Sequence, residues 1–248
     1  MSHKLYNIFM NKFDDTDVTA GFDRNIDLVP IRDELMKALK LHHNGLYKKA
    51  VLKLQPNGLY EKEEGFSIQK SNRLIYIVTE LIQLKNGSRI TEAINAFRQF
   101  IEEGRNLNDK VLVKICKSGG TKYKFGNFGK GEKVKYEAKD RHRKIVFPKK
   151  WILDSISEED LTKLFKHFRS QRIDYILENS MRKRILRYMI AHHNSNTHSL
   201  RYAFINHMIY VEKRDINDVA KFVGHTNLNQ ITRYTQYKNC EKLFDIDF

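Results

Sequence analysis

The stretch from Thr197 to Tyr237 decides how this chain folds, and it reads THSLRYAFINHMIYVEKRDINDVAKFVGHTNLNQITRYTQY. Apolar residues recur at helical spacing between Thr197 and Val211, which predicts an amphipathic helix with one buried face. Asp215 is the predicted N-cap of a second, short helix, and Gly224 is its predicted left-handed stop. A third helix is expected after that glycine. The stretch therefore predicts three consecutive helices joined by tight turns.

Four polar side chains of this stretch form a pattern that suits phosphate chemistry. His198 and Arg201 are three residues apart, so they lie side by side on the first turn of the first helix. The exposed amide groups of that turn also favour an anion. His225 directly follows the glycine stop, on a turn from which its side chain can point into a site, and Tyr234 follows nine residues later. Three anion-binding groups and one oxygen nucleophile together predict phosphoryl transfer.

A further arginine lies upstream, at a predicted junction between two helices in the range Ser67 to Glu103. The segment GSRITEA, from Gly87 to Ala93, follows a long apolar run. Glu92 stands three residues after Arg89, so its carboxylate would hold the guanidinium while that group faces a phosphate. The sequence therefore predicts a second arginine for the same site.

Each motif also has an ordinary interpretation when it is taken alone. A His-x-x-Arg pair is common on solvated helix faces, and Gly-His after a helix is usually a simple C-cap. The arginine and glutamate would be a surface ion pair, and Tyr234 is one of 12 tyrosines in the chain. The order and spacing of all the motifs in one chain favour the shared site.

With these motifs the sequence resembles the tyrosine recombinase or integrase family, whose chemistry is shared with type IB topoisomerases. GSRITEA is similar to the first arginine box of the family, and HSLRYAF to its His-x-x-Arg box. VGHTNLNQITRYTQY is similar to its Gly-His and nucleophile box. The resemblance spans roughly Ser71 to Tyr237, and the combination of boxes is specific although each box is weak.

The resemblance implies a role for each matching residue. The residues that would bind the scissile phosphate are Arg89, His198, Arg201 and His225. Tyr234 would attack that phosphate. Tyr237 competes for this role, but the nine-residue step from His225 matches Tyr234.

The resemblance also implies a lysine on a turn between two strands, which protonates the leaving oxygen. The segment YEAKDRHRKIVFP is similar to that hairpin, and it assigns the role to Lys139. Lys117, in ICKSGG, also follows a predicted strand and precedes a turn. Either lysine could instead be a solvated side chain that only contacts a backbone phosphate.

The fold class implied is α+β and mainly α-helical: a tyrosine recombinase catalytic fold with a small antiparallel three-stranded sheet. Alternation of apolar and polar residues predicts strands near Val111 to Cys116 and near Lys133 to Ala138, and Ile145 to Phe147 forms another before Pro148. Ser157 is a predicted N-cap of a later helix.

Two regions are expected along the chain: a short N-terminal helical region at 1–65 and a catalytic domain at 66–248. In the first, a helix is expected after Pro30, and Leu46 to Leu54 is interpreted as a second short helix. This region looks too short for the helical DNA-clamping domain that usually precedes the family's catalytic domain. The chain is then either a fragment or a minimal enzyme.

Composition points to an intracellular protein that meets a polyanion. The chain has 248 residues, with 45 Lys plus Arg against 30 Asp plus Glu, which gives a net charge of +15. Nucleic acid is the first candidate partner for such a charge. No apolar run approaches the ~18 to 20 residues of a membrane span. Cys116 and Cys240 form neither a disulfide framework nor a zinc pattern, and no signal peptide is visible, so a cytoplasmic location is expected.

The function predicted is site-specific recombination or integration of double-stranded DNA through a covalent 3′-phosphotyrosine, by a homo-oligomer, a tetramer, on DNA. No metal or nucleotide cofactor is expected, since the chain has no Walker-type loop and no two-metal carboxylate cluster. A topoisomerase-like enzyme and a non-catalytic DNA-binding protein are the alternatives. A composition rich in lysine, asparagine and isoleucine suggests a mobile element of an archaeon or bacterium.

Overall fold

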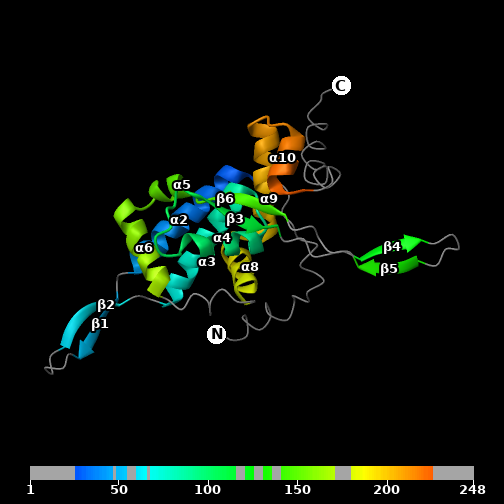
Figure 1. Cartoon of the computed structure of the whole chain (residues 1–248). Helices are drawn as coiled ribbons and strands as arrows, with labels where there is room; N and C mark the ends of the chain where they lie inside the picture. Colours follow the sequence, from blue (N-terminus) through cyan, green and yellow to red (C-terminus); the bar gives the residue numbers. More distant parts are fainter. Residues whose placement is uncertain are drawn as a thin grey trace, which may run out of the picture.

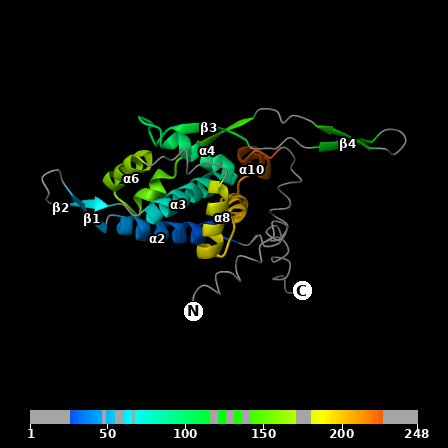
Figure 2. The ribbon, with the colours of Figure 1, turned by 90° about the horizontal axis from the view of Figure 1, so that it is seen from below.

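Helix α3 (Ile68–Asn86) lies at the centre of the helical body (Figures 1 and 2). The computed structural model describes residues 26–46, 49–54, 60–65, 68–115, 121–125, 131–135, 141–170 and 180–225. The apolar run of α3 between Leu74 and Leu84 is fully buried, and α3 packs against α2, α4, α8, α9 and strand β6. The other described helices are α2 (Leu28–Leu46), α4 (Ile90–Phe100), α5 (Lys149–Leu153), α6 (Glu158–Ser170), α8 (Ser180–His193), α9 (Thr197–Asn206), η2 (His207–Val211) and α10 (Ile216–Val223).

The two helices predicted to flank Arg89 are confirmed as α3 and α4. The predicted cap of α6 is also present, because the Ser157 hydroxyl accepts a hydrogen bond from the backbone N–H of Asp160 at 3.0 Å. The Asp215 carboxylate likewise accepts from the N–H groups of Asn217 and Asp218, at 2.8 and 3.3 Å. Local capping signals therefore placed these helix starts correctly.

The helix predicted from Thr197 to Val211 is α-helical only as far as Asn206. It continues as the π-helical turn η2, which the apolar spacing did not predict. Asn196 caps α9, because its side-chain oxygen accepts from the N–H groups of His198 and Ser199 at 2.8 and 3.1 Å. This cap fixes the turn of α9 that carries the first predicted site residues.

The described strands pair two by two and antiparallel: β1 (Lys49–Leu54) with β2 (Tyr60–Gly65), β3 (Lys110–Lys114) with β6 (His142–Val146), and β4 (Thr121–Phe125) with β5 (Gly131–Lys135). The α+β and mainly helical class is thus confirmed, while the three-stranded sheet and the recombinase fold stay predictions. In Figures 1 and 2 the pairs β1–β2 and β4–β5 project from opposite sides of the helical body. The division at residue 65 also stays a prediction.

The short helix predicted for Leu46 to Leu54 is wrong. Residues 49–54 form β1, whose Lys49 pairs with Gly65 and whose Leu54 pairs with Tyr60. A partner strand only a few residues away supplies backbone hydrogen bonds that an isolated short helix would have to form alone. The Pro56-Asn57-Gly58 sequence between them is a typical hairpin signal.

The pair β3–β6 lies against the end of α3 because Asn86 binds the edge of β6. The Asn86 side chain donates to the carbonyl oxygen of Val146 at 2.9 Å and accepts from the Val146 N–H at 3.0 Å. Val111 and Val113 of β3 and Ile145 of β6 face the core.

Among the described residues, no helix is long and apolar enough to cross a lipid bilayer.

Gly87 lies at the junction between α3 and α4, and a substitution there measures how tightly the junction is packed. Its φ is +54°, and a Cβ added there would lie 2.3 Å from the Phe204 ring of α9. We expect Gly87→Ala to lower the free energy of unfolding by about 2 to 4 kcal/mol, because left-handed strain and core overpacking add. Urea unfolding of the purified protein measures this loss.

Gly104 provides the matched control for this substitution. Its φ is +73°, but nothing lies within 4 Å of an added Cβ. Gly104→Ala therefore carries the backbone strain without the clash, and we expect it to cost about 1 to 2 kcal/mol. Equal losses in the two variants would show that the contact with Phe204 contributes nothing.

Candidate active site

Arg89 lies at the start of α4, where the sequence predicted a junction between helices. Its guanidinium Nη1 donates to Oε1 of Glu92 at 3.1 Å, and its backbone N–H donates to Oε2 at 3.2 Å. Glu92 is fully buried, whereas the Arg89 side chain is 27% exposed. The predicted pair is confirmed, and its arginine retains access to solvent.

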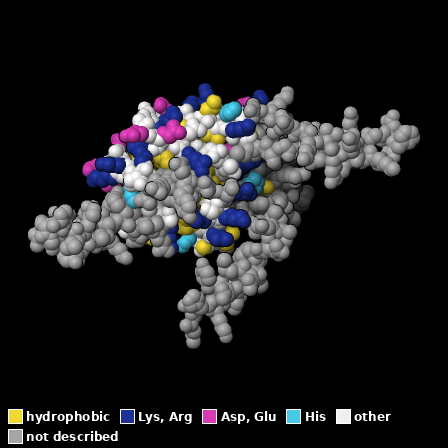
Figure 3. Space-filling model, turned by 60° about the horizontal axis from the view of Figure 1, so that its bottom comes forward, with side chains coloured by type: hydrophobic (Ala, Val, Ile, Leu, Met, Phe, Trp, Pro, Cys, Tyr) yellow, Lys and Arg dark blue, Asp and Glu magenta, His cyan; other side chains and the backbone are white. Residues whose placement is uncertain are grey.

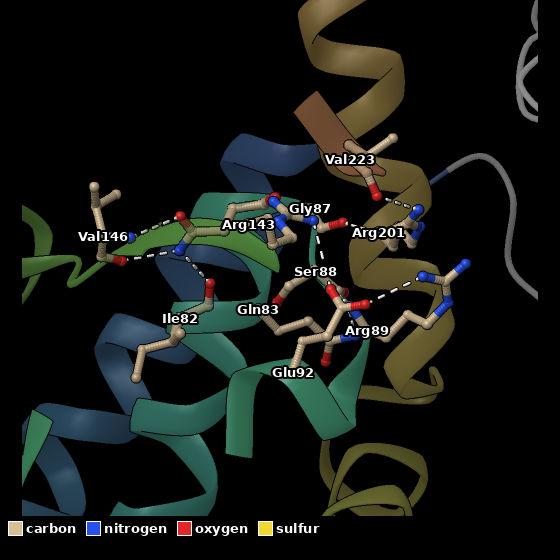
Figure 4. Close-up of polar contacts among 11 residues, drawn as sticks. Ile82, Gln83, Gly87, Ser88, Arg89, Glu92, Arg143, Val146, Arg201 and Val223 are labelled. Atoms are coloured by element: carbon tan, nitrogen blue, oxygen red, sulfur yellow. Dashed lines mark hydrogen bonds and ion pairs between the residues drawn. The ribbon is translucent and has the colours of Figure 1, made fainter. Parts of the chain in front are cut away.

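Arg201 joins three segments that are distant in sequence. It is fully buried on α9, where its Nη1 donates to the carbonyl oxygen of Gly87 at 2.6 Å. Its Nη2 donates to the carbonyl oxygen of Val223, at the end of α10, at 2.8 Å. Figure 4 shows the guanidinium between these two carbonyl groups. One side chain thus links the turn before Arg89 to the turn that carries His225.

Gln83 makes a second link that sequence reasoning missed. Its side-chain amide donates to the carbonyl oxygens of Ser88, at 3.2 Å, and of Thr197, at 2.6 Å. The first of these precedes Arg89 and the second precedes His198 in the chain. A polar residue in the apolar run of α3 was the available signal, but its partners are not visible in a sequence.

His198 is uncharged at neutral pH in this arrangement. Burial, together with the nearby charges of Arg201 and Arg89, lowers its pKa from 6.5 to about 4. Its ring meets the Tyr202 ring edge to face, with centroids 5.4 Å apart. A neutral imidazole has one donor and one acceptor nitrogen. His198 can therefore donate one hydrogen bond to an anion without adding a positive charge to the site.

His225 follows the predicted left-handed stop, which is confirmed by a φ of +74° at Gly224. The His225 N–H donates to the carbonyl oxygen of Ala220 at 2.9 Å, the long backbone bond that closes this kind of helix end. A Cβ on Gly224 would lie 3.0 Å from the Ile115 side chain. The turn is therefore held between α10 and the residue that follows β3.

Four residues of the predicted chemistry lie outside the described residues: Lys117, Lys139, Tyr234 and Tyr237. Both lysines are three residues from a described strand end, Lys117 after Lys114 and Lys139 before His142. These two strand ends are paired with each other in the β3–β6 register. This geometry favours neither Lys117 nor Lys139 as the proton donor.

The described part of the site offers anion-binding groups rather than metal ligands. Within the described ranges, no cluster of three or more His, Cys, Asp or Glu side chains is arranged to hold a metal ion. The groups brought together instead are Arg89, at the start of α4, and His198 and Arg201 on α9, while His225 follows the end of α10 that Arg201 binds. Such a set can stabilise negative charge on phosphate oxygens.

Comparison with known proteins finds two viral relatives that are named as integrases. The virophage protein named "Putative integrase V10", from Sputnik virophage, is 40% identical over 237 residues, which cover 94% of each chain. This chain belongs to that integrase family. "Putative integrase ORF241" of Acidianus two-tailed virus is 30% identical over 170 residues, which cover 66% of this chain and 52% of the viral protein.

A third relative of the integrase-family chain is cellular. An uncharacterized protein of Methanocaldococcus jannaschii is 27% identical over 176 residues, which cover 69% of this chain and 72% of that protein. No protein-family model matches the chain.

Proposed function

We propose that this integrase-family chain is a tyrosine recombinase, which cuts and rejoins double-stranded DNA through a covalent 3′-phosphotyrosine link. The observation that carries the proposal is the position of Arg201. Through Gly87 and Val223 it joins the segment of Arg89, its own helix with His198, and the turn of His225. These are the segments whose motifs resemble the family's phosphate-binding boxes.

The proposed chemistry needs groups that stabilise charge, a nucleophile and an acid. Arg89 and Arg201 would stabilise the non-bridging oxygens as negative charge builds up on them, with His198 and His225 as further donors. The Tyr234 hydroxyl would release its proton to solvent as its oxygen bonds to phosphorus and the bond from phosphorus to the 5′ oxygen breaks. Lys139, or Lys117 in its place, would protonate that oxygen. One phosphodiester replaces another, so the bond energy is kept for rejoining.

The proposed partner is double-stranded DNA, and the net charge of +15 favours it. Lys and Arg side chains are spread over the face in Figure 3, while Asp and Glu gather toward one side of it. Helix α8 carries an exposed run of basic side chains: Arg182, Lys183, Arg184 and Arg187. Recombination joins two DNA sites, so we propose that copies of the chain, a tetramer in the family, act together on DNA.

Covalent trapping tests the reaction class without a known target site. The wild-type protein is incubated with a pool of nicked random duplexes, denatured in detergent, and separated on a denaturing gel. We expect a protease-sensitive adduct that keeps a 5′ label on the cut strand and loses a 3′ label. Sequencing the trapped strands then gives the preferred site.

Three other results would contradict the proposal. Strong DNA binding without any adduct would favour a protein that only binds DNA. An adduct that keeps the 3′ label would place the tyrosine on a 5′ phosphate, opposite to the polarity proposed. A site-independent adduct with relaxation of supercoiled plasmid would favour a topoisomerase.

A further inference from the structure

Arg143 is a third arginine beside the proposed phosphate site and, like Arg201, it is buried; the sequence motifs assigned it no role. It lies on β6, opposite Val113 of β3, and is 7% exposed. Its Nη2 donates to the carbonyl oxygen of Asn86, at the end of α3. Its guanidinium also lies over the Phe222 ring of α10, 5.2 Å from the centroid. Arg143 therefore contacts both α3 and α10 around the junction that carries Arg89.

The contact that matters most is with Glu92, which lies between two arginines. Arg89 binds Oε1 at 3.1 Å, and Nη1 of Arg143 lies 3.5 Å from Oε2. Figure 4 shows the carboxylate with Arg89 on one side and Arg143 on the other. Glu92 is fully buried, so its charge is poorly screened by water. Each arginine therefore changes how strongly the carboxylate holds the other.

The net charge of Glu92 and its arginines decides whether Arg89 is available to a phosphate. Glu92 with Arg89 alone would be a neutral pair, and the carboxylate would compete with a phosphate for that guanidinium. With Arg143 added, the cluster carries a net positive charge. Burial lowers the pKa of Arg143 to about 10, with Glu92 opposing and Arg201 and Arg89 adding to that shift. Arg143 is thus charged at neutral pH, as the balance requires.

We propose that Arg143 is a positioning residue for Arg89: by sharing Glu92, it keeps the Arg89 guanidinium aimed at the scissile phosphate and its charge available there. The inference rests on the proposed function, since it needs a phosphate to act on. It adds a residue from β6, the strand that begins three residues after Lys139, to the groups that organise the site.

A double-mutant cycle separates this role from simple support of the fold. Arg143→Met leaves Glu92 with Arg89 alone, and we expect the single-turnover cleavage rate to fall about 10- to 100-fold while the DNA dissociation constant changes less than about threefold. Adding Glu92→Gln removes the uncompensated carboxylate. The double variant should therefore cleave faster than Arg143→Met, although it carries one more substitution.

Two further variants keep the test decisive. Arg143→Lys retains a charge near Glu92, and we expect it to recover part of the lost rate even if Arg143→Met folds poorly. Arg105→Met removes the arginine of the exposed pair with Glu102, beyond the opposite end of α4, and should cleave like the wild type. Far-UV circular dichroism and urea unfolding confirm that each variant is folded at the assay temperature.

Three outcomes would overturn the inference. Arg143→Met could cleave at the wild-type rate. The second outcome is additivity. Glu92→Gln would then slow cleavage by the same factor in the Arg143→Met protein as in the wild type, as expected if Arg143 had a purely structural role. A wild-type protein that forms no adduct would instead refute the proposed function and remove the phosphate on which this inference depends. Wild-type activity therefore distinguishes the two failures.

Discussion

Tyr234→Phe protein should bind DNA with the affinity of the wild type and form no covalent adduct. The substitution removes one hydroxyl oxygen and keeps the aromatic ring, so it removes the proposed nucleophile with little change in packing. Loss of a nucleophile typically lowers the rate by a factor of about 10⁴ or more. The adduct should therefore fall below detection on the same denaturing gel, while a mobility-shift assay shows unchanged binding.

Tyr237→Phe is the matched control, since it makes the same chemical change three residues away. We expect it to form the adduct at the wild-type rate. If the two variants exchange their results, the nucleophile is Tyr237 and the nine-residue spacing from His225 was assigned to the wrong tyrosine. A double variant, Tyr234→Phe with Tyr237→Phe, lacks both hydroxyls. An adduct formed by that variant would show that neither tyrosine is the nucleophile.

The parts of the site that sequence could predict are those set by neighbours in the chain. The Arg89–Glu92 pair is three residues apart, and the Asp215 cap and the Gly224 stop depend on one helical turn each. Such signals act over a few residues, so the pattern contains them. The adjacent placement of His198 and Arg201 on α9 follows from helical spacing in the same way.

The parts that sequence could not predict depend on contacts between distant residues. Gln83 binds the carbonyl oxygen of Thr197, 114 positions away, and Arg143 reaches Asn86 across 57 positions. Backbone carbonyl groups are present at every residue, so nothing in the pattern identifies which one a side chain will meet. Arg143 also looks like an ordinary strand arginine in a basic hairpin until the alternation of β6 turns it inward.

Arg201 makes structural contacts that the sequence did not predict. The resemblance made it a phosphate clamp, but the structure also makes it the tie between Gly87 on one side and Val223 on the other. A planar guanidinium can donate in two fixed directions at once, whereas a lysine ammonium is a point charge on a flexible stem. Arg201 therefore has a structural role as well as its proposed role in binding the phosphate. A substitution that removes its bonds should lower stability and cleavage together.

Arg201→Lys should accordingly lose both stability and cleavage, even though the charge is kept. Leaving one of the two buried carbonyl groups without a partner costs about 1 to 3 kcal/mol, so urea unfolding should show a loss in that range or above it. Cleavage should fall by a further factor of about 10² to 10³ when measured well below the unfolding midpoint, as expected for removal of one preorganised donor.

Arg105→Lys, at the arginine of the exposed pair with Glu102, is the control, and it should change neither quantity appreciably. The two readouts for Arg201→Lys separate its tasks. A normal unfolding midpoint with lost cleavage would mean that the bonds to Gly87 and Val223 do not hold the segments together. Lost stability with normal cleavage would mean that Arg201 supports the site without acting on the phosphate. Since the same guanidinium makes the bonds and is proposed to face the phosphate, we expect neither loss without the other.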